Sequence, residues 1–478
     1  MNSVTEVNTR ATTSRIPSQE VSRDANTPHV ISNEVIAIAH AAKQASRILA
    51  NLPTAAKDEA LSNIAEALER NSAKILAANA EDVKQGEALI ASGELTRALF
   101  KRLGLNQDKL RAMIDGVLAV RELPDPAGRM LASTMLDAGP EPGQYLRLDK
   151  VSCPLGVLAI IFEARPDAIT QISSLAIKSG NAVILKGGKE VERTMRAILE
   201  VIRGALAAPG SRVPADAVSG VYGREAVQTL LGLTGTIDLV IPRGSNALVQ
   251  HIQRNTHIPV LGHADGVCHI FIDRSADRSR NFERVIPVVV DSKIQYPAVC
   301  NAVETVLVHA EIAAAILPPL YAALHESGVK VRGDARTHAL LADAAIDLVR
   351  DDEWHTEYSD LILAIRVVDS LDAAINHIEQ HGSHHTDAIL TEDAAAAERF
   401  LNEVDSANVL LNCSTRFSDG YRYGFGAEVG ISTSKLHARG PVGLEGLVTY
   451  KYKVIGAGQV VSDYAGDNAR PFLHRRLV

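Results

Sequence analysis

Downstream of Pro154, the chain alternates between short apolar runs and longer segments with helical periodicity. The apolar runs lie at 157–162, 182–186, 217–222, 237–241 and 268–272. The segments between them have helical spacing and lie at 168–178, 193–207, 224–233 and 245–255. Strands that are apolar throughout and alternate with helices predict a parallel, doubly wound α/β sheet with both faces covered.

A second α/β set follows from Glu304 onward. Its predicted strands lie at 305–309, 361–368, 388–391 and 409–412. Upstream, apolar residues recur at three- and four-residue spacing between positions 33 and 120, which predicts helices, and a proline-rich stretch at 123–128 ends this segment. Two further segments, 144–151 and 446–454, alternate apolar and polar residues as exposed strands do.

Length and charge narrow the class of protein. The 478 residues are enough for a large core and for two or three domains. The net charge of −8, with lysines and arginines dispersed along the chain, gives no basic footprint for nucleic acid. No apolar run approaches the roughly 18 residues of a membrane helix. We therefore expect a globular protein that binds neither nucleic acid nor membrane.

Cysteine usage and the N-terminal segment indicate the compartment. The four cysteines, at positions 153, 268, 300 and 413, are far apart and lack the spacing of a zinc site. This pattern suits a reducing cytoplasm, where a thiol stays free to react. Residues 1–33 are polar, contain no apolar signal region and carry acidic residues that transit peptides avoid. We expect them to form a disordered tail.

Cys300 follows a proline-containing loop and stands a few residues before an apolar, β-type run. A cysteine alone is weak evidence, because cysteine is among the residue types most often buried in cores. Its significance rises because the region upstream has features of a nicotinamide site. A thiol nucleophile combined with a hydride carrier can interconvert an aldehyde and an activated acyl group.

Three features predict the nucleotide site. Lys186 ends a buried strand at the edge where α/β sheets place their ligands, and the glycines that follow, Gly187 and Gly188, let backbone approach a ligand closely. Gly244 and Ser245 form the turn between a strand and a helix start, where free N–H groups favour pyrophosphate. Each feature also has an ordinary structural interpretation, and no GxGxxG motif stands in that context.

Longer motifs make the chain similar to a known family. They are Phe162-Glu-Ala-Arg-Pro-Asp, Lys178-Ser-Gly-Asn-Ala-Val-Ile-Leu-Lys-Gly-Gly-Lys-Glu, Asp238-Leu-Val-Ile-Pro-Arg-Gly-Ser-Asn, Tyr296-Pro-Ala-Val-Cys-Asn-Ala-Val-Glu-Thr, Trp354-His-Thr-Glu-Tyr-Ser-Asp-Leu-Ile-Leu-Ala, Gly424-Phe-Gly-Ala-Glu-Val-Gly-Ile-Ser-Thr and Arg439-Gly-Pro-Val-Gly-Leu-Glu-Gly-Leu-Val-Thr-Tyr-Lys-Tyr-Lys. Over residues 34–462 the chain resembles the glutamate-5-semialdehyde dehydrogenases, also called gamma-glutamyl phosphate reductases, of the aldehyde dehydrogenase superfamily.

The resemblance implies an α/β, aldehyde dehydrogenase-like fold, with a Rossmann-type cofactor domain, an α/β catalytic domain and a β-strand extension for oligomerisation. We accordingly expect an NADP-binding domain at 34–143 and 153–264, a catalytic domain at 265–440, and oligomerisation strands at 144–152 and 441–462. A homo-oligomer is the implied assembly.

The departures from ordinary aldehyde dehydrogenases are informative about the reaction. Oxidising members hold a glutamate in a Glu-Leu-Gly-Gly motif that activates water, and the corresponding stretch here, 259–266, lacks it. Loss of a deacylating base suits a reductase, because its thioacyl intermediate must survive until hydride arrives. The superfamily's oxyanion asparagine also lacks an equivalent in the Phe162 motif, which leaves the backbone N–H of Cys300 and an unidentified donor. Lys189 stands where NAD-preferring relatives hold a ribose-binding glutamate, and a cation there favours NADPH over NADH.

The resemblance implies the second step of proline biosynthesis from glutamate. Cys300 attacks the acyl carbon of gamma-glutamyl phosphate and expels phosphate, and NADPH then reduces the thioester to glutamate 5-semialdehyde. Because the acyl phosphate is labile, glutamate 5-kinase is a candidate partner that hands it over.

The substrate carries a phosphate and a carboxylate, so the site needs cations and N–H donors. Candidate substrate-binding residues are Arg165, Asn301, Arg416 and Arg439, although a structural ion pair is an equally good interpretation of each arginine. The motifs also contain three acidic residues, Glu163, Glu304 and Glu428. For each of them a helix-capping or pairing role is as good an interpretation as a catalytic role. His384 and His385 do not favour a metal site, because neighbours on a strand point to opposite faces and no partner stands at ligand spacing.

Three alternatives remain at this stage. One is a hydrolytic or coenzyme A-dependent aldehyde dehydrogenase acting on another small aldehyde, which the missing glutamate disfavours. A second is a fusion with a glutamate kinase, for which about 33 residues upstream are too few. A third is a non-catalytic nucleotide-binding or scaffold protein, which the intact Cys300, Lys186 and Gly244 disfavour.

Overall fold

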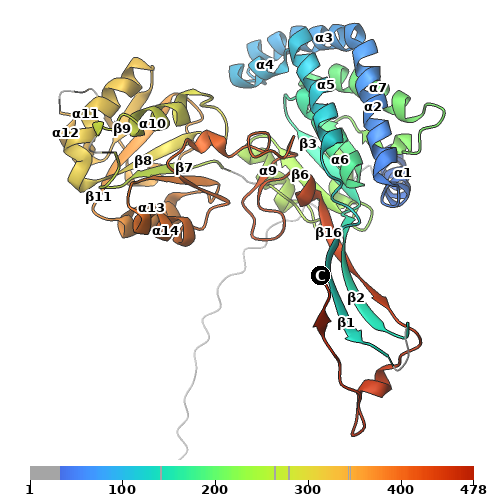
Figure 1. Ribbon diagram of the computed structural model, residues 1–478. Coiled ribbons are helices and arrows are strands. Elements are labelled where there is room, and N and C mark those ends of the chain that lie inside the picture. The colour runs from blue at the N-terminus through green and yellow to red at the C-terminus, as the bar shows by residue number, and fades with distance from the viewer. Residues whose placement is uncertain (1–32, 140–142, 263–264, 278–279, 343, 345) are drawn as a thin grey trace, which may run out of the picture.

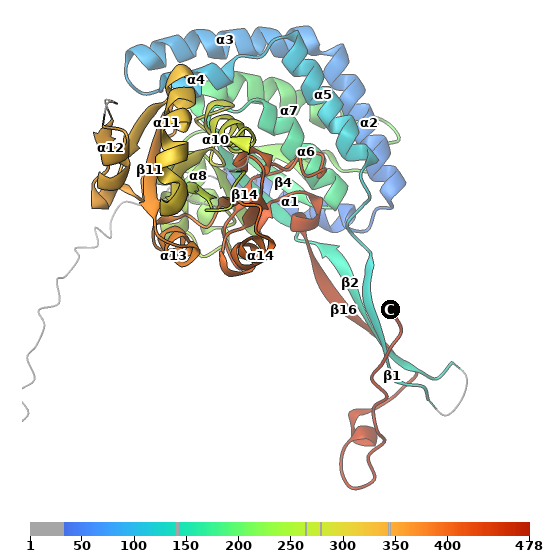
Figure 2. The same ribbon diagram turned by 60° about the vertical axis from the view of Figure 1, so that its left-hand side comes forward.

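The computed structural model describes residues 33–139, 143–262, 265–277, 280–342, 344 and 346–478. The chain forms two α/β bodies side by side and a β-ribbon arm that projects away from them (Figures 1 and 2). The predicted tail at 1–33 lies outside this range except for Asn33, which begins the first helix. None of the described helices is long and apolar enough to cross a membrane.

The helices are α1 (Asn33–Leu49), α2 (Thr54–Arg70), α3 (Ser72–Ala91), α4 (Arg97–Leu103), α5 (Gln107–Glu122), α6 (Asp167–Ser179), α7 (Glu192–Leu206), α8 (Glu225–Gly232), α9 (Asn246–Arg254), α10 (Val285–Ile294), α11 (Ala310–Glu326), α12 (Ala335–Leu340), α13 (Leu371–His381) and α14 (Ala394–Glu403). The strands are β1 (Met130–Asp137), β2 (Leu146–Pro154), β3 (Val157–Phe162), β4 (Ala182–Gly187), β5 (Val218–Gly220), β6 (Leu239–Arg243), β7 (Cys268–Ile272), β8 (Val303–His309), β9 (Lys330–Gly333), β10 (Asp347–Leu348), β11 (Ile362–Val368), β12 (Thr386–Leu390), β13 (Asn408–Leu411), β14 (Ile431–Ser432), β15 (Gly440–Pro441), β16 (Val448–Ile455) and β17 (Arg475–Arg476).

The first body is built on a parallel sheet in the order β5-β4-β3-β6. Strand β3 is buried along its whole length because alternate residues face two different helical layers. Leu158 and Ile160 join the core with α2, α5, α6 and α7, whereas Ala159 and Ile161 face α1, α8 and α9. The doubly wound arrangement predicted from the apolar runs is confirmed here.

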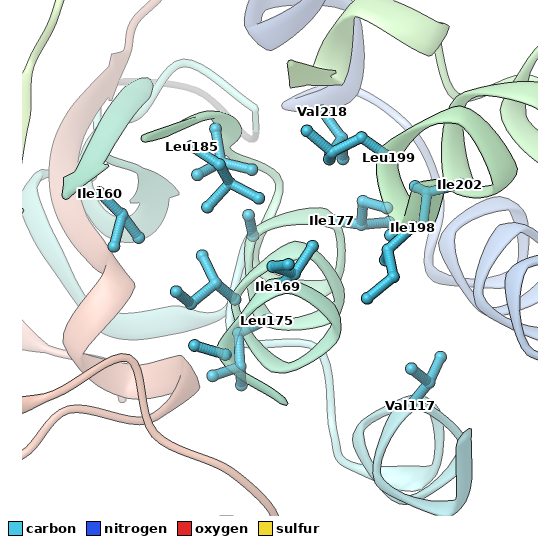
Figure 3. Close-up of a cluster of buried hydrophobic side chains, with 14 of the residues drawn as sticks. Val117, Ile160, Ile169, Leu175, Ile177, Leu185, Ile198, Leu199, Ile202 and Val218 are labelled. Carbon is cyan, nitrogen blue, oxygen red and sulfur yellow. The ribbon is translucent and has the colours of Figure 1, made fainter. Parts of the chain in front are cut away.

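The larger of these layers holds a close-packed apolar cluster. Ile169, Leu175 and Ile177 of α6 lie between the sheet and the helices around it (Figure 3). The predicted helical segment at 33–120 is observed as five helices, α1 to α5, and Val117 of α5 packs into the same cluster. Burial of this apolar surface fixes the carboxyl edge of the sheet, where the strand ends collect.

The second body is a seven-stranded parallel sheet in the order β10-β9-β11-β8-β7-β12-β13. Helices α10, α11 and α12 cover one face and α13 and α14 the other (Figure 1). The apolar pattern placed the 268–272 run with the strands of the first sheet, although the segment 265–440 expected to form the catalytic domain includes it. In the structure this run is β7, which pairs with β8 and β12 in the second sheet. Two short strands, β9 and β10, were not predicted, because two to four residues are too few to establish a periodicity.

The arm is an antiparallel sheet in the order β16-β2-β1-β17. The two predicted strands are present as β2 and β16, paired from Val448↔Pro154 to Ile455↔Arg147. The predicted boundaries were too narrow. Strand β1, within the segment 34–143 assigned to the cofactor domain, pairs with β2 instead, and the C-terminal residues beyond 462 return to pair with β1. Both errors have one cause, because strand partners are set by long-range pairing that a local pattern does not encode.

Candidate active site

Cys300 lies in the turn between α10 and β8, half-buried. Its backbone packs so closely on Gly266 that a Cβ at that glycine would lie 2.3 Å from the Cys300 carbonyl oxygen. The thiol of Cys268 donates to the same carbonyl oxygen at 3.1 Å. Next to Cys300, the Asn301 amide donates to the carbonyl oxygen of Ser418 at 2.6 Å. These contacts hold the turn in one conformation and present the Cys300 side chain to a cleft.

The cleft has a volume of about 660 Å³ and lies between the two α/β bodies, where β6 and α9 face the second body (Figure 1). It brings together six of the residues that the sequence proposed for the site or its cofactor, which are Cys300, Asn301, Arg165, Arg416, Gly244 and Ser245. The Arg102 guanidinium of α4 crosses to the other body and donates to the Ala298 carbonyl oxygen at 3.0 Å. The thiol and the predicted pyrophosphate turn thus line one cavity.

Four guanidinium groups line the cleft, from Arg102, Arg165, Arg243 and Arg416. Burial, together with the charge of Arg165, lowers the pKa of Arg243 to about 10. Burial also lowers the pKa of Arg416, whose Nε donates to the Gln295 side chain at 2.9 Å. A pKa of about 10 leaves Arg243 a cation at neutral pH, and a cleft lined by several guanidinium groups suits a substrate with more than one negative charge.

The acidic residues of the motifs occupy three different positions. Glu304 forms a buried ion pair with Lys293 at 2.7 Å, which joins the two ends of the Cys300 turn. Glu428 lines the cleft and accepts the Gly420 N–H at 2.8 Å, and burial raises its pKa to about 7. Glu163 accepts the Ser245 N–H at 2.8 Å. In the structure, each of the three carboxylates therefore pairs with a cation or accepts a backbone N–H.

The predicted nucleotide features lie on one edge of the first sheet, at the carboxyl ends of β3, β4 and β6. Lys186 ends β4, and burial lowers its pKa against the opposing charges of nearby glutamates. At the start of α9, the Ser245 N–H already binds an anion, the Glu163 carboxylate. A turn that binds a carboxylate in this way fits the pyrophosphate of a dinucleotide. Lys186 and the α9 turn are the residues that would hold such a cofactor.

The glycines after Lys186 have a structural reason within the chain. A Cβ at Gly188 would lie 2.1 Å from a Glu190 carboxylate oxygen, and one at Gly187 would lie 2.8 Å from Val191. The Glu190 carboxylate in turn accepts the Ala164 N–H at 2.7 Å. The group that lies closest to the Gly188 backbone is therefore the Glu190 carboxylate of the chain itself.

Lys189 forms an ion pair with Glu94, from the loop after α3, and both side chains are half exposed. A second cation, Arg224, interacts electrostatically with Glu94 and Lys186. It follows β5, which pairs with β4, so the two strand ends bring Arg224 to the same edge as Lys186. Arg102, Arg224 and Arg243 are cations of this region that sequence reasoning missed. Arg243 stood in a quoted motif directly before Gly244, and this position after a strand was the available signal.

Two predicted positions are corrected by the structure. Arg439 does not line the Cys300 cleft; its guanidinium pairs with the Asp405 carboxylate at 2.9 Å, near the base of the arm. Its local motif could not reveal that partner, which lies 34 residues away. His384 and His385 precede β12 instead of lying on a strand, and His384 has a left-handed backbone with φ of 57°.

Comparison with known proteins identifies the relatives of this chain. The model of the aldehyde dehydrogenase family matches residues 8–347. Gamma-glutamyl phosphate reductase 1 of Synechocystis sp. is 53% identical over 440 residues, which are 92% of this chain and 97% of that protein. The gamma-glutamyl phosphate reductase of Synechococcus elongatus is 52% identical over 437 residues, 91% of this chain and 97% of that protein.

The crystal structure of gamma-glutamyl phosphate reductase from Thermotoga maritima superposes with a TM-score of 0.83 and 39% identity, and covers 90% of this chain and 100% of that one. The resemblance drawn from the motifs and the fold class it implied are thus both confirmed. The chain belongs to the aldehyde dehydrogenase family and, within it, to the gamma-glutamyl phosphate reductases.

Proposed function

We propose that this protein reduces gamma-glutamyl phosphate to glutamate 5-semialdehyde and phosphate, through a thioester on Cys300, as the second step of proline biosynthesis from glutamate. One observation carries the proposal: a cysteine, four guanidinium groups and the anion-binding start of α9 line a single cleft. The names of the relatives, at 52–53% identity over more than nine-tenths of the chain, point to the same substrate.

The chemistry follows from the groups in the cleft. The Cys300 thiolate attacks the acyl carbon, a C–S bond forms, and the C–O bond to phosphate breaks. Arg165, Arg243 and Arg416 are placed to bind the phosphate and the carboxylate, so that neither anion has to be buried without a counter-charge. A nicotinamide cofactor held by Lys186 and the α9 turn would supply the hydride that this reduction needs. Cleavage of the C–S bond then returns the Cys300 thiolate with the aldehyde.

Family membership makes the cofactor a nicotinamide nucleotide, and we propose NADPH as the form used. The proposal rests on Lys189 and Arg224, two cations near Lys186 at the edge of the sheet. A 2′-phosphate offers them a stronger acceptor than a ribose hydroxyl does. In the structure Lys189 forms an ion pair with Glu94. Lys189 would therefore have to leave Glu94 in order to bind the 2′-phosphate.

A hydrolytic or coenzyme A-dependent aldehyde dehydrogenase is the main alternative. The stretch 259–266 lacks the water-activating glutamate that oxidising aldehyde dehydrogenases hold at this position. In the reverse reaction, we therefore expect phosphate bound by the arginines to accept the acyl group from the Cys300 thioester.

Phosphate dependence is the decisive measurement. The enzyme is given glutamate 5-semialdehyde and NADP⁺, with and without inorganic phosphate, and NADPH formation is followed by absorbance. Strict dependence on phosphate is the expected result, since only phosphorolysis then releases the acyl group. Turnover without phosphate would mean that water resolves the thioester, and turnover only with coenzyme A would identify the second alternative.

The nucleophile is tested by substitution. Cys300→Ser is expected to lower kcat by at least about a thousandfold, in the range found for other essential nucleophiles. Cys153→Ser, at the end of β2 and also half-buried, is the matched control and should keep normal turnover. Near-normal activity of Cys300→Ser would overturn the thioester mechanism.

Three further expectations belong to this proposal. Glutamate 5-kinase is the candidate donor of the labile acyl phosphate, and interception of all product by an added acyl-phosphate trap would count against direct handover. The four cysteines form no disulfide among the described residues, which supports a reducing cytoplasm as the location. A homo-oligomer held together by the arm is the expected assembly.

A further inference from the structure

The carboxylate of Glu163 lies on the first turn of α9. Glu163 follows β3, its N–H donates to the Arg243 carbonyl oxygen at 3.2 Å, and its Oε2 accepts the Ser245 N–H at 2.8 Å. The fit is close, because a Cβ at Gly244 would lie 2.5 Å from the same Oε2. The carboxylate therefore covers the turn between β6 and α9 from the cleft side.

This contact uses the group that a dinucleotide would need. The first N–H groups of a helix have no intrahelical acceptor, and together with the helix dipole they attract a negative charge. In the described part of the chain Glu163 supplies that charge, and its side chain makes no other hydrogen bond or ion pair within 4.0 Å. A pyrophosphate cannot accept from the Ser245 N–H while Oε2 occupies it.

A cation nearby gives the displaced carboxylate a second position. Lys186, at the end of β4, lies within the electrostatic reach of Glu163, and β3 and β4 are paired up to Phe162↔Gly187. A Glu163 carboxylate that leaves the α9 turn still has this lysine as an opposite charge nearby. The charge that leaves the helix start is thus not left without compensation.

We propose that Glu163 is an internal competitor of the cofactor pyrophosphate, bound at the start of α9 when the cofactor is absent and displaced when it binds. The inference rests on the proposed function, in which α9 holds the pyrophosphate. Its consequence is that dinucleotide affinity is lower than the turn alone would give, and that the carboxylate assists cofactor release by returning to the Ser245 N–H.

The test measures NADP⁺ binding to the whole protein by isothermal titration calorimetry, without substrate. Glu163→Ala is expected to tighten binding by about tenfold, the effect of removing a competing charge at close range. Glu163→Gln keeps the shape and the acceptor oxygen but loses the charge, and should give a smaller gain. Glu200→Gln, the same change on an exposed residue of α7, is the control and should leave the affinity unchanged.

A ligand without the pyrophosphate separates this effect from a general change of charge. The affinity for adenosine 2′-monophosphate should be equal in the wild type and in Glu163→Ala. Unchanged or weaker NADP⁺ binding in Glu163→Ala would overturn the inference, as would an equal gain for adenosine 2′-monophosphate. Failure of the wild type to bind NADP⁺ at all would instead overturn the cofactor assignment in the proposed function.

Discussion

At the scale of single residues, burial decides which groups in the cleft carry charge. Glu428 and Arg243 both line the cleft. Burial shifts the pKa of each toward the neutral form, and this effect is larger than the opposing effect of the other residue's charge. The pKa of Glu428 rises to about 7, whereas that of Arg243 falls to about 10. Near neutral pH the arginine is therefore charged and the glutamate is partly protonated, which keeps the cleft positive for an anionic substrate.

The raised pKa of Glu428 predicts a pH-dependent loss of stability. In the folded protein this carboxyl holds its proton up to about pH 7, whereas in the unfolded chain it releases the proton near pH 4.5. Its contribution to the free energy of unfolding is thus fully present below about pH 4.5 and is lost as the pH rises to about 7, at most about 3 kcal/mol.

Glu428→Gln removes this titration. Its melting temperature relative to the wild type should increase between pH 5 and pH 8, because only the wild type loses stability in that interval. Thermal unfolding of both proteins at the two pH values measures the difference. A constant offset would contradict the prediction, since it would mean that Glu428 does not change protonation over this range.

At the scale of elements, the turn between α6 and β4 fixes the amino end of β4, at the edge of the sheet opposite the cofactor site. Helix α6 ends at Gly180, whose φ of 83° is left-handed, and the Asn181 N–H closes the turn on the Ala176 carbonyl oxygen at 2.8 Å. A Cβ at Gly180 would lie 2.7 Å from Pro154 Cγ, at the end of β2. One glycine therefore joins a helix of the core, a strand of the cofactor sheet and the base of the arm.

Gly180→Ala is expected to lower the free energy of unfolding by roughly 2–4 kcal/mol, from left-handed backbone strain and the clash with Pro154. Gly210→Ala is the matched control, because its φ of 93° is also left-handed but nothing lies within 4 Å of its Cβ position. It should cost only about 1 kcal/mol. Chemical denaturation of both variants gives the comparison, and equal losses would exclude the steric part.

The elements also show how far a local pattern reaches. The 157–162 run is β3 and the 268–272 run is β7 at the predicted bounds, because a strand buried on both faces is apolar at every position. The predicted strand at 237–241 is instead found at Leu239–Arg243. Asp238 explains the shift, since its carboxylate is used by Lys43 and by the Val157 N–H, and the strand begins after it.

At the scale of the whole molecule, the arm has one edge covered and one open. The C-terminal segment pairs with β1 through Thr134↔Arg476 and Met135↔Arg475, while β16 ends the sheet on the other side. The outward residues of β16 include Tyr450, Tyr452 and Val454, exposed by 48%, 59% and 61%. An open strand edge with exposed aromatic and aliphatic side chains is what an association surface requires, and this supports the proposed homo-oligomer.

Tyr452→Glu is expected to reduce the molecular mass in solution, measured by size-exclusion chromatography with light scattering. It places a negative charge on the apolar face of β16, where burial against a second copy would be costly. Thr449→Glu adds the same charge to the opposite, polar face of the strand and is the control. If both variants keep the mass of the wild type, or lose it equally, this face of β16 is not the contact.

The sequence by itself determined the parallel α/β class, the position of Cys300 shortly before the strand β8, and the turn of Gly244 and Ser245 before α9. These features follow from periodicity and turn chemistry, which act over a few residues and are visible in the chain. Only the tertiary structure decided which charges meet. It brought Arg243 into the cleft, paired Arg439 with Asp405 and Lys189 with Glu94, and laid the Glu163 carboxylate on α9. Burial and pairing join residues that are distant along the chain, and no local pattern contains that information.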